Sequence, residues 1–474
     1  LAQHEVLWYI ILADVPNTTT KERYNYYAKQ EKIQPQPLLE TALIDHAYIT
    51  EALKGLISDP EFASRHRQKD TDFVRIQFLT FQNVILFLMN LIKSSLQPEL
   101  DNFFKVLYCK ELIERIVTKS AFSIARKKLK ASAFVELNSY LITRIYRLFQ
   151  PKRWYGLNLR AIDGSTLRLP DTADVIATFG REYPENARPY TMGRISHLYD
   201  PINHLTIDAH IVPYRDDERS LLVKHLEALR PGDLLLLDAG YPAFWVFAEL
   251  LRRKIDWCAR ASLGSWSVIS DFVASGRSEL TVLLPAPNGK ALHECRERGL
   301  SCDPIRVRLV RVPLSKGEIE VLITSLLDVE KYPYEVFQPL YHLRWQEEES
   351  YKFLKCRSEI GNWSGKSSLS VYQDFHARIL SVNLTKSLIM SSQDIVDIKN
   401  SVIDTPKQVN RTHALSVMKN AIISILTITD PLALLRSLIE IFSCTVESVR
   451  DGRSFERRKD IKPRAYYQAY KQCF

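Results

Sequence analysis

The sequence predicts an α/β protein in which a mixed sheet is interrupted by a β-rich segment and flanked by helical regions. Three observations predict this fold class. Apolar runs typical of strands alternate with helical periodicity over residues 151–261. Apolar and charged residues alternate in parts of residues 262–330, as in antiparallel strands. Helical periodicity with few glycines fills residues 41–150 and returns from about residue 335.

The composition is that of a globular protein. The chain has 474 residues, 46% hydrophobic and 25% charged, which is enough to bury a large core and excludes a disordered tail or fibrous repeat. The 64 Lys and Arg residues against 55 Asp and Glu give a net charge of +9, which is compatible with a polyanionic partner without demanding one. The longest apolar run, residues 78–92, contains polar residues and is shorter than a bilayer span, so we expect no membrane association.

The seven cysteines indicate reduced thiols in a cytoplasmic protein, because their number is odd and they form no close CxxC pair. The nearest approach to a metal cluster is His293, Cys295 and Cys302, whose spacing matches no standard zinc pattern. Residues 1–40 show neither a basic segment before their apolar stretch nor a convincing cleavage site after it. We therefore expect no signal peptide and treat them as a poorly defined lead-in.

Residues 41–150 are predicted as a helical, DNA-binding region. Residues 73–91 predict a central helix, and two shorter helices follow near 119–130 and 133–148. These two helices resemble a DNA-binding helix-turn-helix, although a solvated helix face explains the charges equally well. The first of the two carries five positive charges, on Lys119, Arg126, Lys127, Lys128 and Lys130.

The predicted core begins at Pro151 and has the order strand, hairpin, helix, strand, helix, strand. Its segments are strand 157–163, hairpin strands 195–199 and 205–212, helix 217–229, strand 234–238, helix 243–253 and strand 255–260. Three further strands are predicted in the inserted β-rich subdomain, at 279–284, 305–312 and 318–326. The resulting regions are core 151–261, insertion 262–330, core 331–395 and a helical, basic carboxy-terminal region 396–474.

Two aspartates stand at the ends of predicted strands. Asp163 ends the first strand. Asp238 ends the strand predicted over 234–238, whose other residues are a continuous apolar run. Because ligands in α/β sheets bind beyond the carboxyl ends of strands, we expect both carboxylates at one sheet edge. Gly164 and Gly240 allow a tight turn and the close approach of a substrate there. Taken alone, each aspartate is more often a turn former or a helix cap.

The third acid lies on a predicted helix. Tyr341, Arg344, Glu348 and Lys355 have offsets of 0, 3, 7 and 14 residues, which places them within an arc of about 60°. Lys352 falls near the same stripe. One face of the helix therefore presents an aromatic ring, a guanidinium, a carboxylate and ammonium groups in a row.

Three carboxylates beside basic residues suit two-metal phosphoryl transfer. Hard Mg²⁺ or Mn²⁺ ions prefer carboxylate oxygens, and two ions about 4 Å apart activate the attacking oxygen and stabilise the leaving one. Arg344, Lys352 and Lys355 would hold phosphates, and Tyr341 would pack on a sugar or base.

Glu348 itself lies in a run of three glutamates, a pattern usually typical of a solvated helix face. We assign that solvated role to its neighbours Glu347 and Glu349, which lie about 100° to either side of it. The three acids together, with the appropriate elements between them, favour catalysis over the solvated-face reading of Glu348.

The element order resembles the RNase-H-like fold. The spacing Tyr-x2-Arg-x3-Glu-x6-Lys resembles the YREK signature of the DDE transposases of bacterial insertion sequences, in the family numbered four. Asp163-Gly-Ser-Thr and Asp238-Ala-Gly-Tyr resemble the family's first and second acid motifs, and residues 262–330 resemble its β-rich insertion. The resemblance covers roughly residues 70–385, and the helix signature is its specific part.

The resemblance implies DNA transposition in a bacterial, nucleoid-associated setting. A homodimer would bind the terminal inverted repeats, metal-activated water would cleave the double-stranded DNA at the transposon end, and the freed 3′-hydroxyl would attack target DNA. Asp163, Asp238 and Glu348 would be the ligands of two Mg²⁺ or Mn²⁺ ions. The residues expected to contact DNA are Tyr341, Arg344, Lys352 and Lys355, with Arg126, Lys127, Lys128 and Lys130 from the helical region.

The sequence allows two roles for each of two further residues, Arg260 and Trp266. Arg260 ends the strand before the insertion and either faces DNA or is an ordinary strand-end charge. Trp266 is a candidate for an aromatic residue that holds a flipped base, and a core tryptophan is the alternative. No nucleotide cofactor is expected, because residues 361–367 have three residues between their glycines where a P-loop needs four.

Two other functions remain open at this stage. One is a metal-dependent nuclease or resolvase on the same fold, which would cut DNA without joining ends. The other is a transposase-derived DNA-binding protein without catalysis. Retention of the three acids with Tyr341, Arg344 and Lys355 argues against the second, since a decayed site need not keep them.

Overall fold

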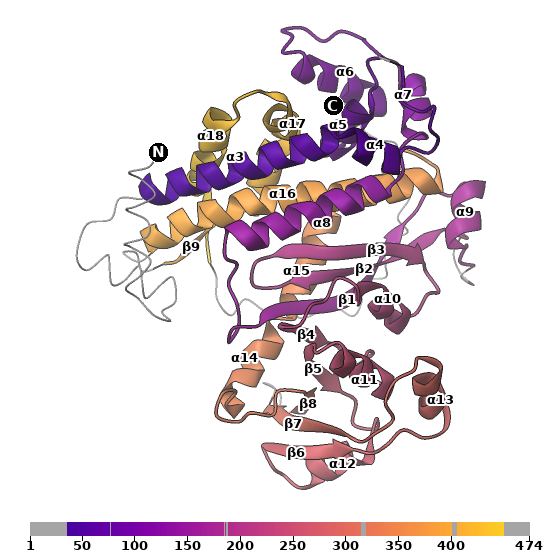
Figure 1. The fold of residues 1–474 in the computed structure, drawn as a ribbon, viewed down its shortest axis with the longest axis vertical. Helices are drawn as coiled ribbons and strands as arrows, with labels where there is room; N and C mark the ends of the chain where they lie inside the picture. The colour runs from indigo at the N-terminus through magenta and orange to yellow at the C-terminus, as the bar shows by residue number, and fades with distance from the viewer. Residues whose placement is uncertain are drawn as a thin grey trace.

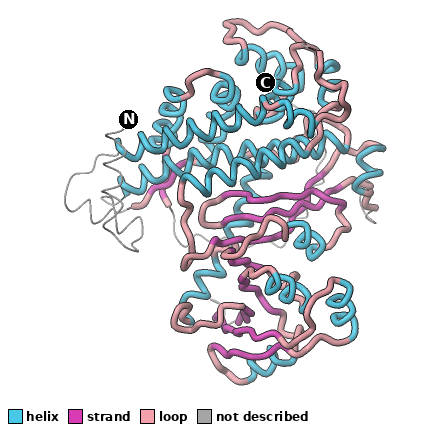
Figure 2. The backbone as a smooth tube through the Cα atoms, viewed as in Figure 1, coloured by secondary structure: helices cyan, strands magenta, loops and turns pink. Residues whose placement is uncertain are grey.

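The computed structural model describes residues 36–75, 77–183, 185, 188–313, 319–400 and 405–449. It consists of one eight-stranded sheet with a thick layer of helices over the strands at one end of the sheet (Figures 1 and 2). The strands are β1 (Asn158–Arg168), β2 (Met192–Asp200), β3 (Leu205–Pro213), β4 (Asp233–Leu237), β5 (Asp256–Ala261), β6 (Glu279–Leu284), β7 (Ile305–Pro313) and β8 (Ile319–Thr324).

The first five strands have the topology of the RNase-H-like fold, which confirms the predicted fold class. Their order in the sheet is β3-β2-β1-β4-β5. Strands β1, β4 and β5 are parallel, and β2 is antiparallel to both β1 and β3. The apolar run of β4 is buried throughout, as expected for a strand covered on both faces.

The first strand is longer than predicted. It continues to Arg168, because its second half pairs with β2 alone, after its pairing with β4 ends at Ile162. Asp163 therefore does not end β1; it is the first residue beyond the β1–β4 ladder.

Three helices belong to the core: α9 (Ala173–Phe179), α10 (Glu218–His225) and α11 (Phe244–Arg252). Helix α10 begins where predicted, because the carboxylate of Asp217 accepts a hydrogen bond from the backbone N–H of Ser220 at 2.9 Å. It ends at His225, earlier than the periodicity indicated.

The inserted segment contains the three predicted strands and two helices, α12 (Ser267–Ala274) and α13 (Gly289–Glu297). Strand β8 pairs with β5, and β7 and β6 follow it in the same sheet. The insertion therefore extends the core sheet and does not form a sheet of its own. Its apolar residues, such as Ile269 and Phe272, share a core with Phe247 and Trp257.

The helical layer is formed by both ends of the described chain. Its helices are α3 (Gln36–Ser58), α4 (Pro60–His66), α5 (Phe81–Met89), α6 (Leu96–Leu107), α7 (Lys119–Arg126), α8 (Ser132–Leu148), α16 (Ser368–Asn400), α17 (Arg411–Thr427) and α18 (Leu432–Cys444). Two short strands, β9 (Lys407–Val409) and β10 (Val446–Ser448), form a separate pair.

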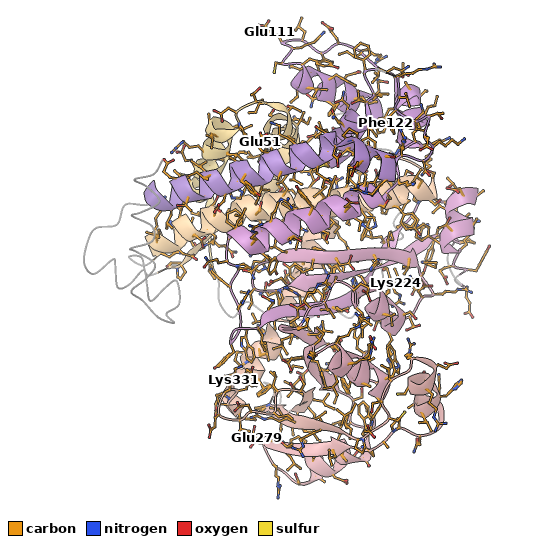
Figure 3. The ribbon with its side chains drawn as sticks, in the orientation of Figure 1. Glu51, Glu111, Phe122, Lys224, Glu279 and Lys331 are labelled. Atoms are coloured by element: carbon orange, nitrogen blue, oxygen red, sulfur yellow. The ribbon has the colours of Figure 1, made fainter. Side chains whose placement is uncertain are left out.

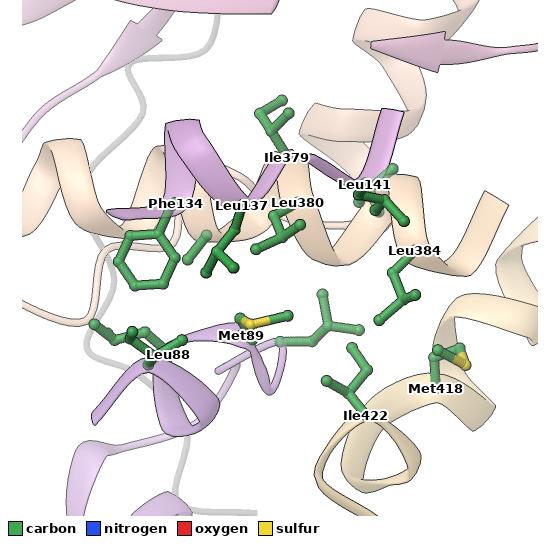
Figure 4. Close-up of a cluster of buried hydrophobic side chains, with 14 of the residues drawn as sticks. Leu88, Met89, Phe134, Leu137, Leu141, Ile379, Leu380, Leu384, Met418 and Ile422 are labelled. Carbon is green, nitrogen blue, oxygen red and sulfur yellow. The ribbon is translucent and has the colours of Figure 1, made fainter. Parts of the chain in front are cut away.

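One hydrophobic core joins these helices. Figure 4 shows Met89 of α5, Leu137 of α8, Leu380 of α16 and Ile422 of α17 in a single cluster. Helix α16 lies in the middle and packs against α3, α5, α8, α17, α18 and β3. The helical regions that the sequence predicts separately, before and after the core, thus fold as one body.

One prediction for the helical region is wrong. The predicted helix over residues 73–91 exists only from Phe81, because Phe73 has a left-handed φ of 59° and Thr80 caps α5 by accepting from Asn83 N–H. Helix α8, the second of the two helices that resemble a helix-turn-helix, packs along α3, α16 and β3. The basic segment 450–464 and nearly all of the lead-in lie outside the described residues.

The edge of the sheet at β3 is covered by side chains from this layer. Asn383 of α16 accepts from Thr206 N–H and donates to Thr206 O, at 3.0 and 2.7 Å. Asn383 also donates to Asn138 Oδ1 of α8 at 2.7 Å. These contacts satisfy backbone groups that an edge strand would otherwise expose. Among the described helices, none is long and apolar enough to cross a membrane.

Candidate active site

The topology brings the two aspartates to neighbouring positions. Ile162 of β1 is in register with Leu237 of β4, so the next residue of each strand is an aspartate, Asp163 and Asp238. The YREK segment lies against β1 at this point (Figure 1). It is not one regular helix: it consists of α14 (Phe337–His342), α15 (Trp345–Lys352) and a π-helical turn (Phe353–Arg357).

The acids are held in similar ways and stay accessible. Asp163 Oδ1 accepts from Gly164 N–H at 2.7 Å, and Asp238 Oδ1 accepts from Ala239 N–H at 2.8 Å. The side chains of Asp163, Asp238 and Glu348 are 23%, 30% and 27% exposed. Each carboxylate can therefore still receive a ligand from solvent.

Arg344 lies between the first and third acids. Its Nη1 is 3.6 Å from Asp163 Oδ2, and its Nη2 is 3.6 Å from Glu348 Oε1. The guanidinium is buried, with its side chain 6% exposed. Its Nε and Nη1 have no hydrogen-bond partner among the described residues, so a buried donor pair faces the acid cluster.

Two other residues contact the second acid. Arg260 Nη2 lies 2.8 Å from Asp238 Oδ1, and Arg260 Nη1 lies 3.2 Å from Glu320 Oε1 of β8. Tyr341 OH lies 3.5 Å from Asp238 Oδ1, and burial raises the pKa of Tyr341, which keeps its hydroxyl protonated. The insertion thus contributes Glu320 to the ionic network around Asp238.

The two lysines of the signature segment behave differently. Lys355 Nζ donates to Ser165 Oγ of β1 at 2.6 Å, and burial lowers its pKa. Lys352 is exposed and pairs with Glu349 on the outer face of α15. The expected position of Lys352 beside the acids is therefore wrong, whereas Glu349 lies on a solvated face as predicted.

The carboxyl of Asp163 has a raised pKa despite the neighbouring guanidinium of Arg344. Burial raises the pKa of Asp163 to about 6, against the hydrogen bond from Gly164 and the charge of Arg344, and the Asp238 and Glu218 carboxylates add to the rise. Asp163 would thus be partly protonated near neutral pH. A cation beside it would restore the charged form.

Glu218 is a fourth carboxylate that the sequence analysis missed. It begins α10 and pairs with Arg194 at 3.4 Å. A Cβ at Gly240 would lie 2.8 Å from Glu218 Oε2, and one at Gly164 would lie 3.6 Å from Oε1. The absence of a side chain at Gly240, and to a lesser degree at Gly164, therefore leaves room for this carboxylate. Glu218 directly follows the N-cap Asp217, which gives it the appearance of a first-turn acid.

Glu347 is not on a solvated face, which corrects the sequence-based assignment. It is fully buried, and burial raises its pKa well above the usual range. Its Oε1 lies 3.4 Å from His197 Nε2, and neither carboxylate oxygen has a hydrogen-bond partner among the described residues. The face of α15 that carries Glu347 and, four residues later, Tyr351 packs onto the sheet. The four-residue spacing between Glu347 and Tyr351 is the sequence signal that could have revealed the buried position of Glu347.

Tyr351 connects this helix to β1. Its hydroxyl donates to the backbone carbonyl of Asp163 at 2.8 Å and accepts from His197 N–H at 3.2 Å. Asp163 and His197 are register partners on β1 and β2. The tyrosine hydroxyl is therefore inserted between the two strands at the first acid.

The basic residues of the helical region are not brought to the acids. Arg126 is buried, with Nη2 2.9 Å from Asp374 Oδ1 and Nε donating to Gln373 Oε1 at 2.9 Å. This pairing contradicts the expected DNA contact, because the charge is already neutralised inside the helical layer. Lys127 is exposed and Lys128 and Lys130 are half-buried. These lysines follow α7, which lies on the opposite side of the molecule from α14 in Figure 1.

Trp266 precedes α12, where its ring stacks on that of Phe247 with centroids 5.9 Å apart. The indole is partly buried against the core that the insertion shares with β4 and β5. This packing accounts for the residue as a core tryptophan.

Comparisons with known proteins agree with this geometry. A sequence model described as "Transposase DDE domain" matches residues 154–384, which include all three acids. "Transposase InsG for insertion sequence element IS4" from Escherichia coli (strain K12) is 26% identical over 278 residues. That alignment covers 57% of this chain and 61% of InsG, so the chain spans less than two thirds of this relative.

Among solved structures, the "Cryo-EM structure of piggyBac transposase synaptic complex with hairpin DNA" matches with a TM-score of 0.41 and 11% identity, over 82% of this chain and 85% of that chain. Residues 154–384 are thus similar to the transposase DDE domain, and part of the chain is similar to InsG.

Proposed function

We propose that this protein is a catalytic DNA transposase that binds the terminal inverted repeats of an insertion sequence, cleaves the DNA at those ends and joins them to target DNA. One observation carries the proposal. The carboxylates of Asp163 and Glu348 flank the buried guanidinium of Arg344, and Asp238 follows β4 at the position in register with Asp163. The DDE domain match and the similarity to InsG support the same activity.

The residues present fit divalent metal ions of the Mg²⁺ or Mn²⁺ type. Asp163, Asp238 and Glu348 would hold them, because hard cations prefer carboxylate oxygens and all three side chains are partly exposed. The raised pKa of Asp163 also favours a cation beside it. When bound, two such ions would activate the attacking oxygen and stabilise the leaving one.

The protein's own residues would orient the DNA. Arg344, whose Nη1 and Nη2 lie at the acids, would donate to a phosphate oxygen there. Lys355 would exchange the Ser165 hydroxyl for a phosphate and thereby hold the backbone next to β1. Arg260 and Tyr341 would keep Asp238 in place while remaining within reach of the DNA end.

Binding of the terminal repeats would involve the helical layer as well. The exposed Lys119 and Lys127 and the half-buried Lys128 and Lys130 form a basic surface at α7. We propose that this surface contacts phosphates and that two copies of the chain hold the two ends as a dimer. Because phosphate contacts release counterions, the affinity should fall steeply as salt rises.

The test uses the full chain and DNA fragments from the flanks of its coding region. Asp163→Asn, Asp238→Asn and Glu348→Gln should each abolish Mg²⁺-dependent cleavage while leaving binding of the same fragments largely intact. Glu349→Gln is the matched control, since it removes a carboxylate one residue away on the solvated face. Full cleavage by any of the three site variants would refute the assignment.

A strand-transfer assay separates the remaining possibilities. Pre-cut ends incubated with target plasmid should give joined products. Cleavage without joining would instead indicate a nuclease on the same fold. Specific binding without either reaction would indicate a DNA-binding derivative of a transposase.

A further inference from the structure

A second polar cluster lies beneath α10, apart from the three acids. Asp208 and His210 are two residues apart on β3 and therefore face the same side of the sheet. His225 is the last residue of α10 and follows Lys224, which is labelled in Figure 3. Asp208 Oδ2 is 2.8 Å from His225 Nδ1 and 2.9 Å from His210 Nε2.

Two polar groups flank the ring of His225. The hydroxyl of Ser196 on β2 lies 3.0 Å from His225 Nε2 and 3.2 Å from the backbone carbonyl of Asp163. The Asp208 oxygen that lies 2.8 Å from His225 Nδ1 is the same oxygen that lies near His210.

His210 Nε2 lacks an ordinary partner. It is buried and lies 2.9 Å from the same Asp208 oxygen, yet it has no hydrogen-bond partner of acceptable geometry among the described residues. The two imidazole rings also lie close together, with centroids 4.7 Å apart. A single cation between the three groups would give His210 Nε2 a partner and would bind the Asp208 oxygen and His225 Nδ1 as well.

We propose that Asp208, His210 and His225 form a binding site for one divalent transition-metal ion, and that zinc is the ion they suit best. Two imidazoles and a carboxylate are a common zinc donor set, whereas magnesium prefers oxygen ligands only. All three donor atoms already lie within 4.8 Å of one another. Around an ion with bonds of roughly 2.0–2.2 Å, they need to separate by only about half an ångström.

The surroundings complete the arrangement of such a site. Ser196 would be the outer partner that orients His225, as a hydroxyl or carbonyl commonly does for a ligating histidine. Asp208 and His210 are 18% and 29% exposed, so water can reach the fourth position. The ion would join the edge strand β3 to the end of α10, whose first residue, Glu218, faces Gly164 and Gly240 at the acid cluster. It would thus support the catalytic strand without taking part in the reaction.

The experiment uses the purified full chain after removal of bound metal. Co²⁺ replaces zinc in such sites and gives visible d–d absorption bands when it is tetrahedral. The wild type should bind one equivalent with these bands, and added Zn²⁺ should displace it. Glu348→Gln should bind this equivalent as the wild type does, which separates the site from the proposed catalytic ions.

Variants locate the ion. His210→Ala and Asp208→Asn should lose the bands, while Ser196→Ala should weaken binding by about 10- to 100-fold. His293→Ala is the matched control, because His293 is 71% exposed and pairs with Glu297 on the surface of α13. Far-UV circular dichroism confirms that each variant folds. Asp208→Asn keeps the volume of the side chain and therefore tests the site even where His210→Ala does not fold.

Several outcomes would overturn the proposal. The absence of tetrahedral bands in wild type at excess Co²⁺ would mean that the cluster is only an ion pair, whatever the variants do. Bands that persist in both His210→Ala and Asp208→Asn would place the metal elsewhere. Strong sulfur-to-cobalt charge-transfer absorption would point to a cysteine site. The inference does not depend on the proposed transposase activity, because its readout is metal binding by the chain alone.

Discussion

Replacing Tyr351 with phenylalanine tests how the first acid is held. The hydroxyl donates to the Asp163 carbonyl at 2.8 Å and accepts from His197 N–H at 3.2 Å, inside the β1–β2 ladder. Losing the donated bond costs about 1 kcal/mol, whereas the His197 N–H keeps its register partner Asp163 on β1. The Asp163 carbonyl also keeps the Ser196 hydroxyl as a neighbour. We therefore expect Tyr351→Phe to lower the free energy of unfolding by about 1 kcal/mol.

Urea unfolding followed by circular dichroism measures this change. Tyr48→Phe is the control, since Tyr48 is 54% exposed and its loss should alter stability by less than about 0.5 kcal/mol. Cleavage should slow as well, by about 100-fold if Asp163 moves by about 1 Å, with binding of DNA ends retained. A variant as stable as the wild type would refute the view that this hydroxyl bridges the two strands.

Three further outcomes are expected. Arg126→Ala should destabilise the fold by about 3–5 kcal/mol in urea unfolding, because it leaves Asp374 as an unpaired buried charge. The control Lys127→Ala should change stability by no more than about 0.5 kcal/mol. Equal effects of the two substitutions would contradict the buried pair. Mn²⁺ binding to the acids, followed by calorimetry, should weaken as pH falls below about 6, where Asp163 protonates, and a flat profile from pH 7.5 to 5 would count against it. Glu347→Gln should raise the free energy of unfolding at pH 8 more than at pH 5. Burial raises the pKa of Glu347, so the wild-type protein loses stability as the pH rises above the pKa that this residue has in the unfolded chain. The difference between the urea midpoints of variant and wild type, measured at both pH values, tests this direction.

Much of the core could be predicted from local patterns. The apolar run of β4 and the β2–β3 hairpin have signals that lie within a few residues of the chain, and the structure contains them nearly where expected. The neighbouring positions of Asp163 and Asp238 also follow from sequence, because parallel strands align their carboxyl ends.

The errors have a common physical origin. Whether a charged side chain is solvated depends on what packs against its element, and the sequence does not state this locally. Glu347 is buried because its face of α15 meets β1 and β2, and Arg126 because Asp374 lies across from α7. Asp208, His210 and His225 were missed for the same reason, since a sheet–helix contact brings together residues from β3 and α10.

The shared core of the helical layer has a consequence for the synthesis of the chain. Helices α3 to α8 are synthesised before α16, α17 and α18, which complete their core. Contacts between such distant segments close long loops, which slows folding. The apolar faces of α5 and α8 therefore stay exposed to aggregation until α16 has been synthesised. A product truncated before residue 368 would lack this central helix and would be expected to be insoluble.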